Sequence, residues 1–158
     1  MAVELRVWVA KASDRDAVTQ LLGEFRDWWQ KDEPSDTSIA ETVAGLLDDP
    51  GTEYLLAAAG DDDAAGICQL RYRMSVWTHA QDCWVEDLYV REGQRGHGLG
   101  RALLEATLAR ARARGCRRIE LDVQEDNEGA LALYKTVGFS AEPKGPARSL
   151  LLGMRLDA

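Results

Sequence analysis

The sequence predicts an α/β (α+β) domain in which a mixed, twisted sheet of about six to seven strands is flanked by about four helices. Three observations predict this class. Short segments with alternating apolar and polar residues indicate strands, and longer segments with apolar residues three and four positions apart indicate helices. A strand–helix–strand unit with a short crossover indicates parallel pairing and a right-handed connection. The length suits one domain, residues 1–158, with its own core.

Turn-forming residues punctuate the expected strands. Leu5, Val7 and Val9 fall on one face of the first strand, and the turn Gly60-Asp61-Asp62-Asp63 joins the second strand to the third. The predicted strands are Leu5–Val9, Glu53–Ala59, Ala64–Arg73, Cys83–Val90, Arg118–Val123, Phe139–Ala141 and Arg148–Leu156.

The four expected helices have recognisable starts or ends. Ser13 and Ser38 each precede an acidic residue three positions later, which predicts capping boxes. Gly115 supplies a C-terminal cap for the third helix, and the arginines within 110–114 are interpreted as its solvated, dipole-complementing end. Asn127 is the expected N-cap of the fourth helix.

Charge and composition narrow the function classes. The net charge of −8 argues against nucleic acid as a partner and favours cationic substrates, although acidity also serves solubility alone. No apolar run is long enough for a membrane span, and the first residues lack signal-peptide features. Three cysteines without a CxxC pair fit the reducing cytoplasm, with neither a disulfide framework nor a metal site.

A glycine-rich loop follows the predicted strand that ends at Val90. Its glycines are Gly93, Gly96, Gly98 and Gly100. The first N–H groups of the following helix have no internal partner, the helix dipole is positive there, and glycine lets a phosphate approach the backbone. Arg95 and Arg101 add positive charge, so the loop is predicted to bind a diphosphate.

Two other diphosphate motifs fit less well. A P-loop requires Lys and Ser or Thr after its glycines, whereas Gly100 is followed by Arg101 and Ala102. A dinucleotide site remains the weaker alternative, because Asp122 lies about 20 residues after the loop, but the glycines alternate instead of following G-x-G-x-x-G.

The pattern Arg95-x-x-Gly98-x-Gly100 resembles the acyl-CoA signature of the GNAT superfamily of N-acetyltransferases. Residues 127–139 resemble its second signature, an Asn-initiated helix that carries a Tyr and closes in Gly-Phe. Residues 86–90 resemble the spermidine/spermine, or small-amine, branch. The resemblance implies a GNAT fold, acetyl-CoA as co-substrate, acetyl transfer to a primary amine of a small cationic molecule, and a homodimer, which is common in the family.

The resemblance also implies how the co-substrate is bound. The backbone of Leu88 and Val90 would pair with the pantetheine amides, the Leu88 N–H would serve the oxyanion, and Asn127 would bind the pantetheine arm or a water. His97 is given no catalytic role. The residues expected at the acetyl-CoA site are Leu88, Tyr89, Val90, Arg95, Gly96, His97, Gly98, Leu99, Gly100, Arg101 and Asn127.

Amide formation needs a neutral amine, yet an alkylamine with a pKa near ~10.4 is neutral in only about one molecule per thousand at pH 7. A positioned base, or desolvation that lowers the pKa of the amine, is therefore required. Glu86 and Asp87 are adjacent on a strand and point to opposite faces unless a bulge intervenes. By the resemblance Glu86 is the base, through water, and Asp87 binds the amine. An ion pair with a neighbouring arginine is the alternative for each, and either could be the base.

Tyr134 is the candidate acid, because a phenol with a pKa near ~10 can donate a hydrogen bond or proton to a leaving thiolate with a pKa of about 8.5. Helical spacing with Ala130 and Val137 alone favours a core tyrosine, and the match to the second signature favours the acid. Trp29 and Trp77 are candidates for the acceptor site, where aromatic rings bind cations; packing in the core is the alternative for Trp29.

Two other functions remain open. One is the same chemistry on a protein N-terminus or lysine, which would need an open groove for a peptide. The other is a non-catalytic acyl-CoA-binding module, against which the presence of both Glu86 and Tyr134 argues. The resemblance covers Val85 to Phe139 by motif, and upstream of Val85 it depends on element order alone.

Overall fold

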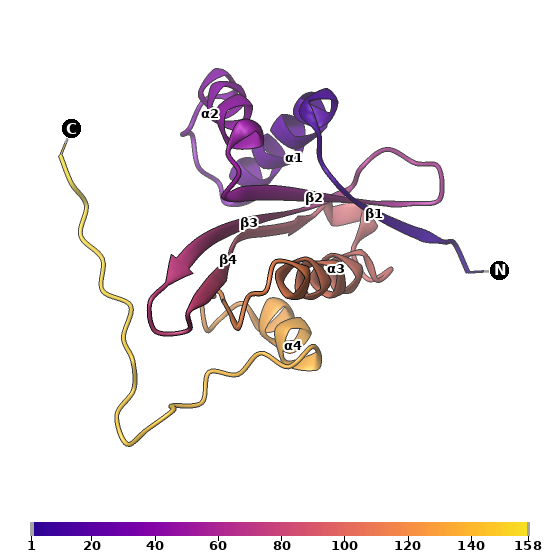
Figure 1. The fold of residues 1–158 in the computed structure, drawn as a ribbon. Coiled ribbons are helices and arrows are strands. Elements are labelled where there is room, and N and C mark those ends of the chain that lie inside the picture. The colour runs from indigo at the N-terminus through magenta and orange to yellow at the C-terminus, as the bar shows by residue number, and fades with distance from the viewer. Residues whose placement is uncertain (1, 158) are drawn as a thin grey trace.

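The computed structural model describes residues 2–157 and has a five-stranded sheet with helices on both faces (Figure 1). The strand order is β1-β2-β3-β4-β5; the first four strands pair antiparallel, and β5 pairs parallel with β4. The strands are β1 (Leu5–Val9), β2 (Thr52–Ala59), β3 (Gly66–Ser75), β4 (Ala80–Val90) and β5 (Arg118–Glu120). The helices are α1 (Arg15–Trp28), α2 (Asp36–Asp48), α3 (Leu99–Ala113) and α4 (Glu128–Thr136), with 3-10 turns at Ala12–Asp14 and Glu92–Gln94.

Strand β2, which lies between β1 and β3, is buried on both faces, because helices cover each side of the sheet. Leu55 and Ala57 pack with α3, whereas Tyr54 and Leu56 pack against α1 and α2. In Figure 1, α1 and α2 lie on one side of the sheet, and α3 and α4 lie on the other. The prediction of a mixed sheet between helices is confirmed, and the apolar composition of β2 reflects burial on both faces.

The sheet has five strands within residues 2–157, and the prediction of six to seven was wrong in the C-terminal part. Segments 139–141 and 148–156 form no strand, and β5 ends at Glu120 instead of Val123. The chain after α4 runs away from the sheet in an extended conformation (Figure 1). Alternating apolar residues show that a segment suits a half-buried strand, but they do not supply the neighbouring strand with which it must pair.

Two of the four predicted helix caps, Asn127 and Gly115, are confirmed, whereas the N-cap of α1 is Asp14 and not Ser13. Asn127 is the N-cap of α4, and its Oδ1 accepts a hydrogen bond from the Ala130 N–H at 3.2 Å, as predicted. Gly115 has a φ of +76° beyond the end of α3, as expected of a C-terminal cap. The start of α2 was predicted too late, because its N-cap is Ser35, whose Oγ accepts from the Ser38 N–H at 3.2 Å.

The arginines at the end of α3 do more than complement its dipole, which corrects their interpretation as a solvated end. Arg110 forms an ion pair with Glu53, a side chain that is almost fully buried on β2. Tyr72 donates a hydrogen bond to the same carboxylate at 2.6 Å, and the Arg114 guanidinium lies 4.0 Å from the centre of the Tyr72 ring. Burial would raise the pKa of Glu53, but the hydrogen bonds from Arg110 and Tyr72 outweigh it and lower that pKa.

Replacing Arg110 with alanine is expected to destabilise the protein by about 2 to 4 kcal/mol, because the variant leaves the Glu53 carboxylate buried without its cation. Urea unfolding at pH 7 measures this change. The exposed Arg112, two residues away on the same helix, is the matched control, and its alanine variant should stay within about 0.5 kcal/mol of the wild type. Equal losses in both variants would contradict the role given to the ion pair.

Candidate active site

The site begins where β4 separates from β5. The two strands pair only from Asp82 to Trp84, so the edge of β4 beyond Trp84 is not covered by β5. On its other edge β4 has a β-bulge, because Gln69 pairs with Asp87 while the next residue of β3 pairs with Val85. Glu86 is the extra residue of this bulge. A bulge bends the strand and redirects its side chains, and both Glu86 and Asp87 line one cleft.

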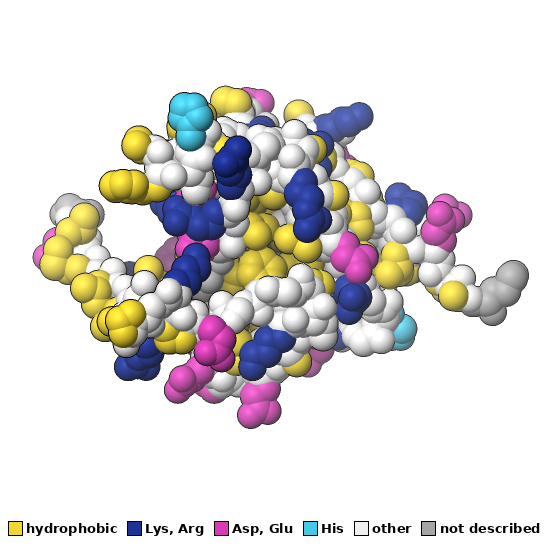
Figure 2. Space-filling view, turned by 60° about the horizontal axis from the view of Figure 1, so that its bottom comes forward, with side chains coloured by type: hydrophobic (Ala, Val, Ile, Leu, Met, Phe, Trp, Pro, Cys, Tyr) yellow, Lys and Arg dark blue, Asp and Glu magenta, His cyan; other side chains and the backbone are white. Residues whose placement is uncertain are grey.

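The cleft has a volume of about 860 Å³. One wall is β4 from Val85 to Val90, and the other is the segment from Leu121 to Gln124 that follows β5. The glycine loop closes one end, and α4 contributes Tyr134. In Figure 2, apolar side chains are visible in a hollow near the middle of the molecular face, with Lys and Arg side chains around it.

The glycine loop has a backbone that other residues would not adopt easily. Gly96 and Gly98 have φ values of +79° and +90°, and Gly98 is the N-cap of α3. A Cβ on Gly100 would lie 3.1 Å from the Leu133 Cδ2 atom, so glycine allows α3 and α4 to approach closely here. The helix N-terminus therefore faces the cleft without intervening side chains, which is the geometry of an anion site.

The predicted co-substrate residues separate into two groups. Leu88, Tyr89, Val90, Arg95, Gly96, Gly98, Leu99, Gly100, Arg101 and Asn127 line the cleft. His97 is not among the lining residues; its exposed ring nitrogen lies 3.4 Å from the Gln94 carbonyl oxygen. His97 therefore differs from its neighbours Gly96 and Gly98, which line the cleft.

Two arginines line the cleft but already have protein partners. The Arg95 Nε donates to the Val90 carbonyl oxygen at 2.8 Å, and its guanidinium lies over the rings of Trp28 and Tyr89, 5.0 Å and 5.7 Å from their centres. Arg101 forms an exposed ion pair with Glu105 at 3.0 Å. The Arg95 side chain therefore lies at the end of the β4 edge. An anionic ligand that displaced this side chain from its present contacts could pair with its guanidinium.

The two adjacent carboxylates have different environments. Glu86 is exposed, whereas Asp87 is half-buried, and burial followed by the nearby charges of Glu86 and Asp122 raises the pKa of Asp87 to about 6. Within residues 2–157 neither carboxylate forms an ion pair, so the alternative of a simple bridge to arginine has no support there. Asp87 is thus a half-buried carboxylate without an ion-pair partner among these residues, at the point where a substrate ammonium could supply one.

A smaller pocket of about 340 Å³ adjoins the cleft. Four residues line both cavities, namely Phe25, Trp29, Lys31 and Asp87. Phe25 stacks on Tyr89 with ring centres 5.1 Å apart and on Trp29 with centres 5.9 Å apart. Asp87 therefore lies at the junction of the two cavities, beside a wall of aromatic rings.

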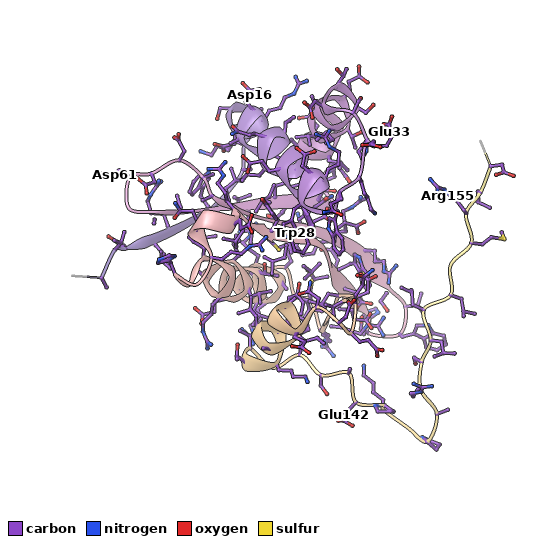
Figure 3. The ribbon with its side chains drawn as sticks, turned by 180° about the vertical axis from the view of Figure 1, so that it is seen from behind. Asp16, Trp28, Glu33, Asp61, Glu142 and Arg155 are labelled. Carbon is purple, nitrogen blue, oxygen red and sulfur yellow. The ribbon has the colours of Figure 1, made fainter. Side chains whose placement is uncertain are left out.

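The sequence identified part of this aromatic wall. Trp29, a candidate for the acceptor site, lines both cavities, and Trp28 lies beside it at the end of α1, near the middle of the molecule in Figure 3. Phe25 and Lys31 were missed; helical spacing places Phe25 on the same face as Trp28 and Trp29, and this signal could have identified it.

Trp77 corrects the prediction of a second aromatic at the acceptor site. It lies in the turn between β3 and β4, is 92% exposed, and lines neither the cleft nor the smaller pocket. The two strands were predicted too short, at Arg73 and Cys83, whereas they continue to Ser75 and from Ala80. The longer hairpin carries its turn beyond the site.

Tyr134 lies on α4 with its side chain largely buried and lining the cleft. Its ring meets Phe139 edge to face with centres 5.8 Å apart, so the turn that follows α4 fixes its position. Burial raises the pKa of Tyr134 to about 12. The phenol is consequently protonated throughout the neutral range and available as a hydrogen-bond donor.

Two features are absent from the described residues, 2–157. No helix there is both long and apolar enough to cross a membrane. No group of three or more His, Cys, Asp or Glu side chains in that range is arranged to hold a metal ion.

The chain is similar in sequence to acetyltransferases and in structure to a solved structure. A thialysine N-epsilon-acetyltransferase from Caenorhabditis elegans is 32% identical over 118 residues, 75% of this chain and 70% of that protein. A streptothricin acetyltransferase from Streptomyces lavendulae is 33% identical over 59% of this chain, and the match spans only 47% of that protein's length. A solved structure from Arthrobacter sp. FB24, assigned to the acetyltransferases, superposes with a TM-score of 0.85 at 31% identity, covering 99% and 98% of the two chains.

The model of one protein family, described as the acetyltransferase (GNAT) family, matches residues 16–139. This range includes α1, the bulged strand β4, the glycine loop and α4 up to Phe139. The match covers more than half of the sequence and every element that lines the cleft. The chain therefore belongs to the acetyltransferase (GNAT) family.

Proposed function

We propose that this acetyltransferase transfers an acetyl group from acetyl-CoA directly to the primary amine of a small cationic molecule. The observation that carries the proposal is the position of Asp87, a desolvated carboxylate at the junction of a long cleft and a smaller aromatic pocket. The long cleft suits the thioester co-substrate, and the smaller pocket suits the acceptor. At neutral pH Asp87 is mostly ionised, so it attracts an ammonium group to this junction.

The residues of the cleft fit acetyl-CoA. The N-terminus of α3 with Gly96, Gly98 and Gly100 would hold the diphosphate, because a Cβ at these positions would strain the loop or meet its neighbours. The uncovered edge of β4 offers the backbone of Leu88 and Val90 to the amides of the pantetheine arm. Acetyl-CoA supplies an acyl group on sulfur that an amine can take with loss of a thiolate.

Three side chains share the proton transfers. Glu86, exposed and on the same cleft, accepts the proton of the incoming ammonium through water. Asp87 orients the amine by charge. Tyr134 donates a hydrogen bond to the departing sulfur; its pKa of about 12 favours this donation over full proton transfer to a thiolate whose pKa is about 8.5. The Leu88 N–H would donate to the acyl oxygen as negative charge develops there.

Direct attack, without an acyl-cysteine, agrees with the state of the thiols. Cys68 and Cys83 are buried, and burial raises the pKa of each thiol to about 12. A thiol needs a lowered pKa to act as a nucleophile. The cysteines are free, which fits the cytoplasmic location included in this proposal.

The acceptor class follows from the pocket and from the names of the relatives. Two matched proteins are named for streptothricin and for thialysine. The pocket beside Asp87 has a volume of about 340 Å³, within the range of small-molecule sites. The rings of Phe25 and Trp29 can hold the cationic or apolar part of such a molecule while its amine lies at Asp87.

The test of the reaction is mass-spectrometric detection of acetylated product from acetyl-CoA with polyamines, aminoglycosides, amino acids and short peptides. We expect one small-amine class to be acetylated, and Tyr134→Phe and Glu86→Gln to reduce kcat/KM at least about tenfold, or ~1.4 kcal/mol of barrier. Acetylation of the peptides alone would indicate that the acceptor is a protein or peptide and not a small amine. Binding of acetyl-CoA without any product would favour a non-catalytic module.

The pH profile of kcat/KM distinguishes the two carboxylates as the base. An acidic limb near pH 6 that persists in Glu86→Gln and disappears in Asp87→Asn would transfer the role of base to Asp87, whose pKa is about 6. With Glu86 as the base, Asp87→Asn raises KM for the amine more than it lowers kcat, because it removes ground-state attraction.

Asp87→Asn is also expected to stabilise the protein in a pH-dependent way. The folded-state pKa of about 6 lies above the ordinary value of 3.8, so the wild type loses stability as Asp87 ionises with rising pH. The free-energy advantage of the variant should therefore grow by about 2 kcal/mol between pH 4.5 and pH 8. Chemical denaturation measures it, with the exposed Asp61→Asn as control. An advantage independent of pH would mean that Asp87 is not desolvated.

Gly98→Ala is expected to weaken coenzyme A binding about 3- to 10-fold, because a Cβ at a φ of +90° is strained and lies 3.3 Å from the Leu5 Cδ1 atom. Gly93→Ala is the matched control in the same loop, since nothing lies within 4 Å of its added Cβ. Titration calorimetry with coenzyme A measures both. Equal affinities of the two variants for coenzyme A would contradict binding of the diphosphate at the N-terminus of α3.

A further inference from the structure

The smaller pocket is lined by both negative and positive side chains. Its four charged residues are Arg26, Lys31, Glu33 and Asp87. Asp87 comes from β4, whereas the other three lie at the end of α1 or in the segment that joins α1 to α2, where Figure 3 labels Glu33. The carboxylate of Asp87 attracts any ammonium group, so the other three charges are those that can distinguish one amine from another.

Arg26 is already neutralised by neighbouring side chains. Its guanidinium forms ion pairs with Asp27 at 2.9 Å and with Asp36 at 2.7 Å, and it donates a hydrogen bond to the Pro34 carbonyl oxygen at 2.9 Å. These contacts connect α1 to the start of α2. The positive charge of Arg26 is thus balanced within the protein, and we assign it no ligand.

Lys31 and Glu33 carry opposite charges and lie two residues apart, but they do not pair. Within residues 2–157 neither side chain forms an ion pair. The Lys31 ammonium lies over the Trp29 ring instead, 5.9 Å from its centre, and Lys31 lines both cavities, as Asp87 does. Glu33 lines only the smaller pocket. Each of these two charges can therefore take a ligand group of opposite charge.

The turn after α1 sets the position of Lys31. The Lys31 N–H donates to the Arg26 carbonyl oxygen at 3.2 Å, and the Gln30 N–H donates to the Asp27 carbonyl oxygen at 2.9 Å, which is the Schellman arrangement of a helix C-terminus. Gln30 has a φ of +55°, in the left-handed region where glycine is usual. The backbone of Lys31 is therefore fixed to the end of α1, whose aromatic residues line the same cavities.

A diamino acid carries three charges that complement those of the pocket. Its side-chain ammonium can bind Asp87, its carboxylate can bind Lys31, and its α-ammonium can bind Glu33. The carboxylate and the α-ammonium are attached to one carbon atom, so their partners must lie near each other, as Lys31 and Glu33 do in the sequence. The methylene chain between the two ends can pack on the rings of Phe25 and Trp29, which also line the pocket.

We propose that Lys31 is a specificity-determining residue that binds the carboxylate of the acceptor, and that the acceptor is a diamino acid acetylated on its side-chain amine. In the transfer, the side-chain nitrogen forms the amide bond as the carbon–sulfur bond of acetyl-CoA breaks, and one proton and the thiol of coenzyme A are released. This assignment of Lys31 rests on the proposed function, because it takes the smaller pocket as the acceptor site. The acceptor of that function then needs a carboxylate as well as an amine.

The test compares free lysine and ornithine with their α-amides, which keep both amines and lack the negative charge. We expect kcat/KM of the wild type to be at least about tenfold higher for each acid than for its amide, mainly through KM, because the amide loses a charged contact. Lys31→Met keeps a long side chain and removes its charge, so this preference should fall to within about twofold. Lys31→Arg should restore most of it. Lys135→Met is the control, since Lys135 is exposed and lines neither cavity, and it should keep the wild-type preference.

The outcomes separate the role of Lys31 from the proposed function. Acetylation of other amines only, or equal use of acid and amide, overturns the role of Lys31 and leaves the proposed function standing. A preference for the acids that Lys31→Met retains also overturns that role. Without acetylation of any amine the proposed function fails, and titration calorimetry with coenzyme A bound then decides. Tighter binding of the acids than of the amides that depends on Lys31 supports a diamino acid as the ligand, and equal binding or none overturns it.

Discussion

Strand β4 is paired along its whole length with β3 on one side but with β5 only from Asp82 to Trp84 on the other. Every backbone N–H and C=O along the uncovered edge needs a partner, from water or from a ligand. The separation of the two strands therefore creates both the cleft and the row of backbone groups that an extended, amide-containing ligand can use. The bulge at Glu86 belongs to the same local departure from regular pairing, and it brings two carboxylates to the start of that edge.

The charges follow the cleft from one end to the other. Asp87 lies at the end that adjoins the smaller pocket, where the neighbouring charges of Glu86 and Asp122 add to the cost of burying it. Arg95, Arg101 and the N-terminus of α3 lie at the other end. The positive end would attract the diphosphate of the proposed acyl donor, and the negative end would attract the ammonium group of the proposed acceptor. The net charge of the chain does not show this separation of charge, because the net charge is the sum of the charges at both ends of the cleft.

Local signals in the sequence predicted most of the elements and much of the site. The glycine loop, the Asn127 cap and the Tyr134 helix depend on short-range geometry, and the structure has them where the sequence placed them. The sequence alone could not predict the bulge at Glu86, because the register of β4 depends on its pairing with β3. Burial distinguishes Asp87 from Glu86, and burial is set by α1, α2 and β3 far away in the sequence. Trp77 was misplaced because hairpin length is decided by cross-strand pairing and not by its own residues.

Helix α3 connects the stability of the fold to the geometry of the site. Its first residue, Leu99, is buried, and its N-terminus faces the cleft through Gly98. Its far end is fixed by the ion pair between Arg110 and the buried Glu53. Because a helix transmits rigid-body shifts along its axis, holding both ends against the sheet fixes the distance between the glycine loop and the β4 edge. A catalytic site requires its groups to be held to within about 0.5 Å, so an interaction more than two helical turns from the chemistry still contributes to it.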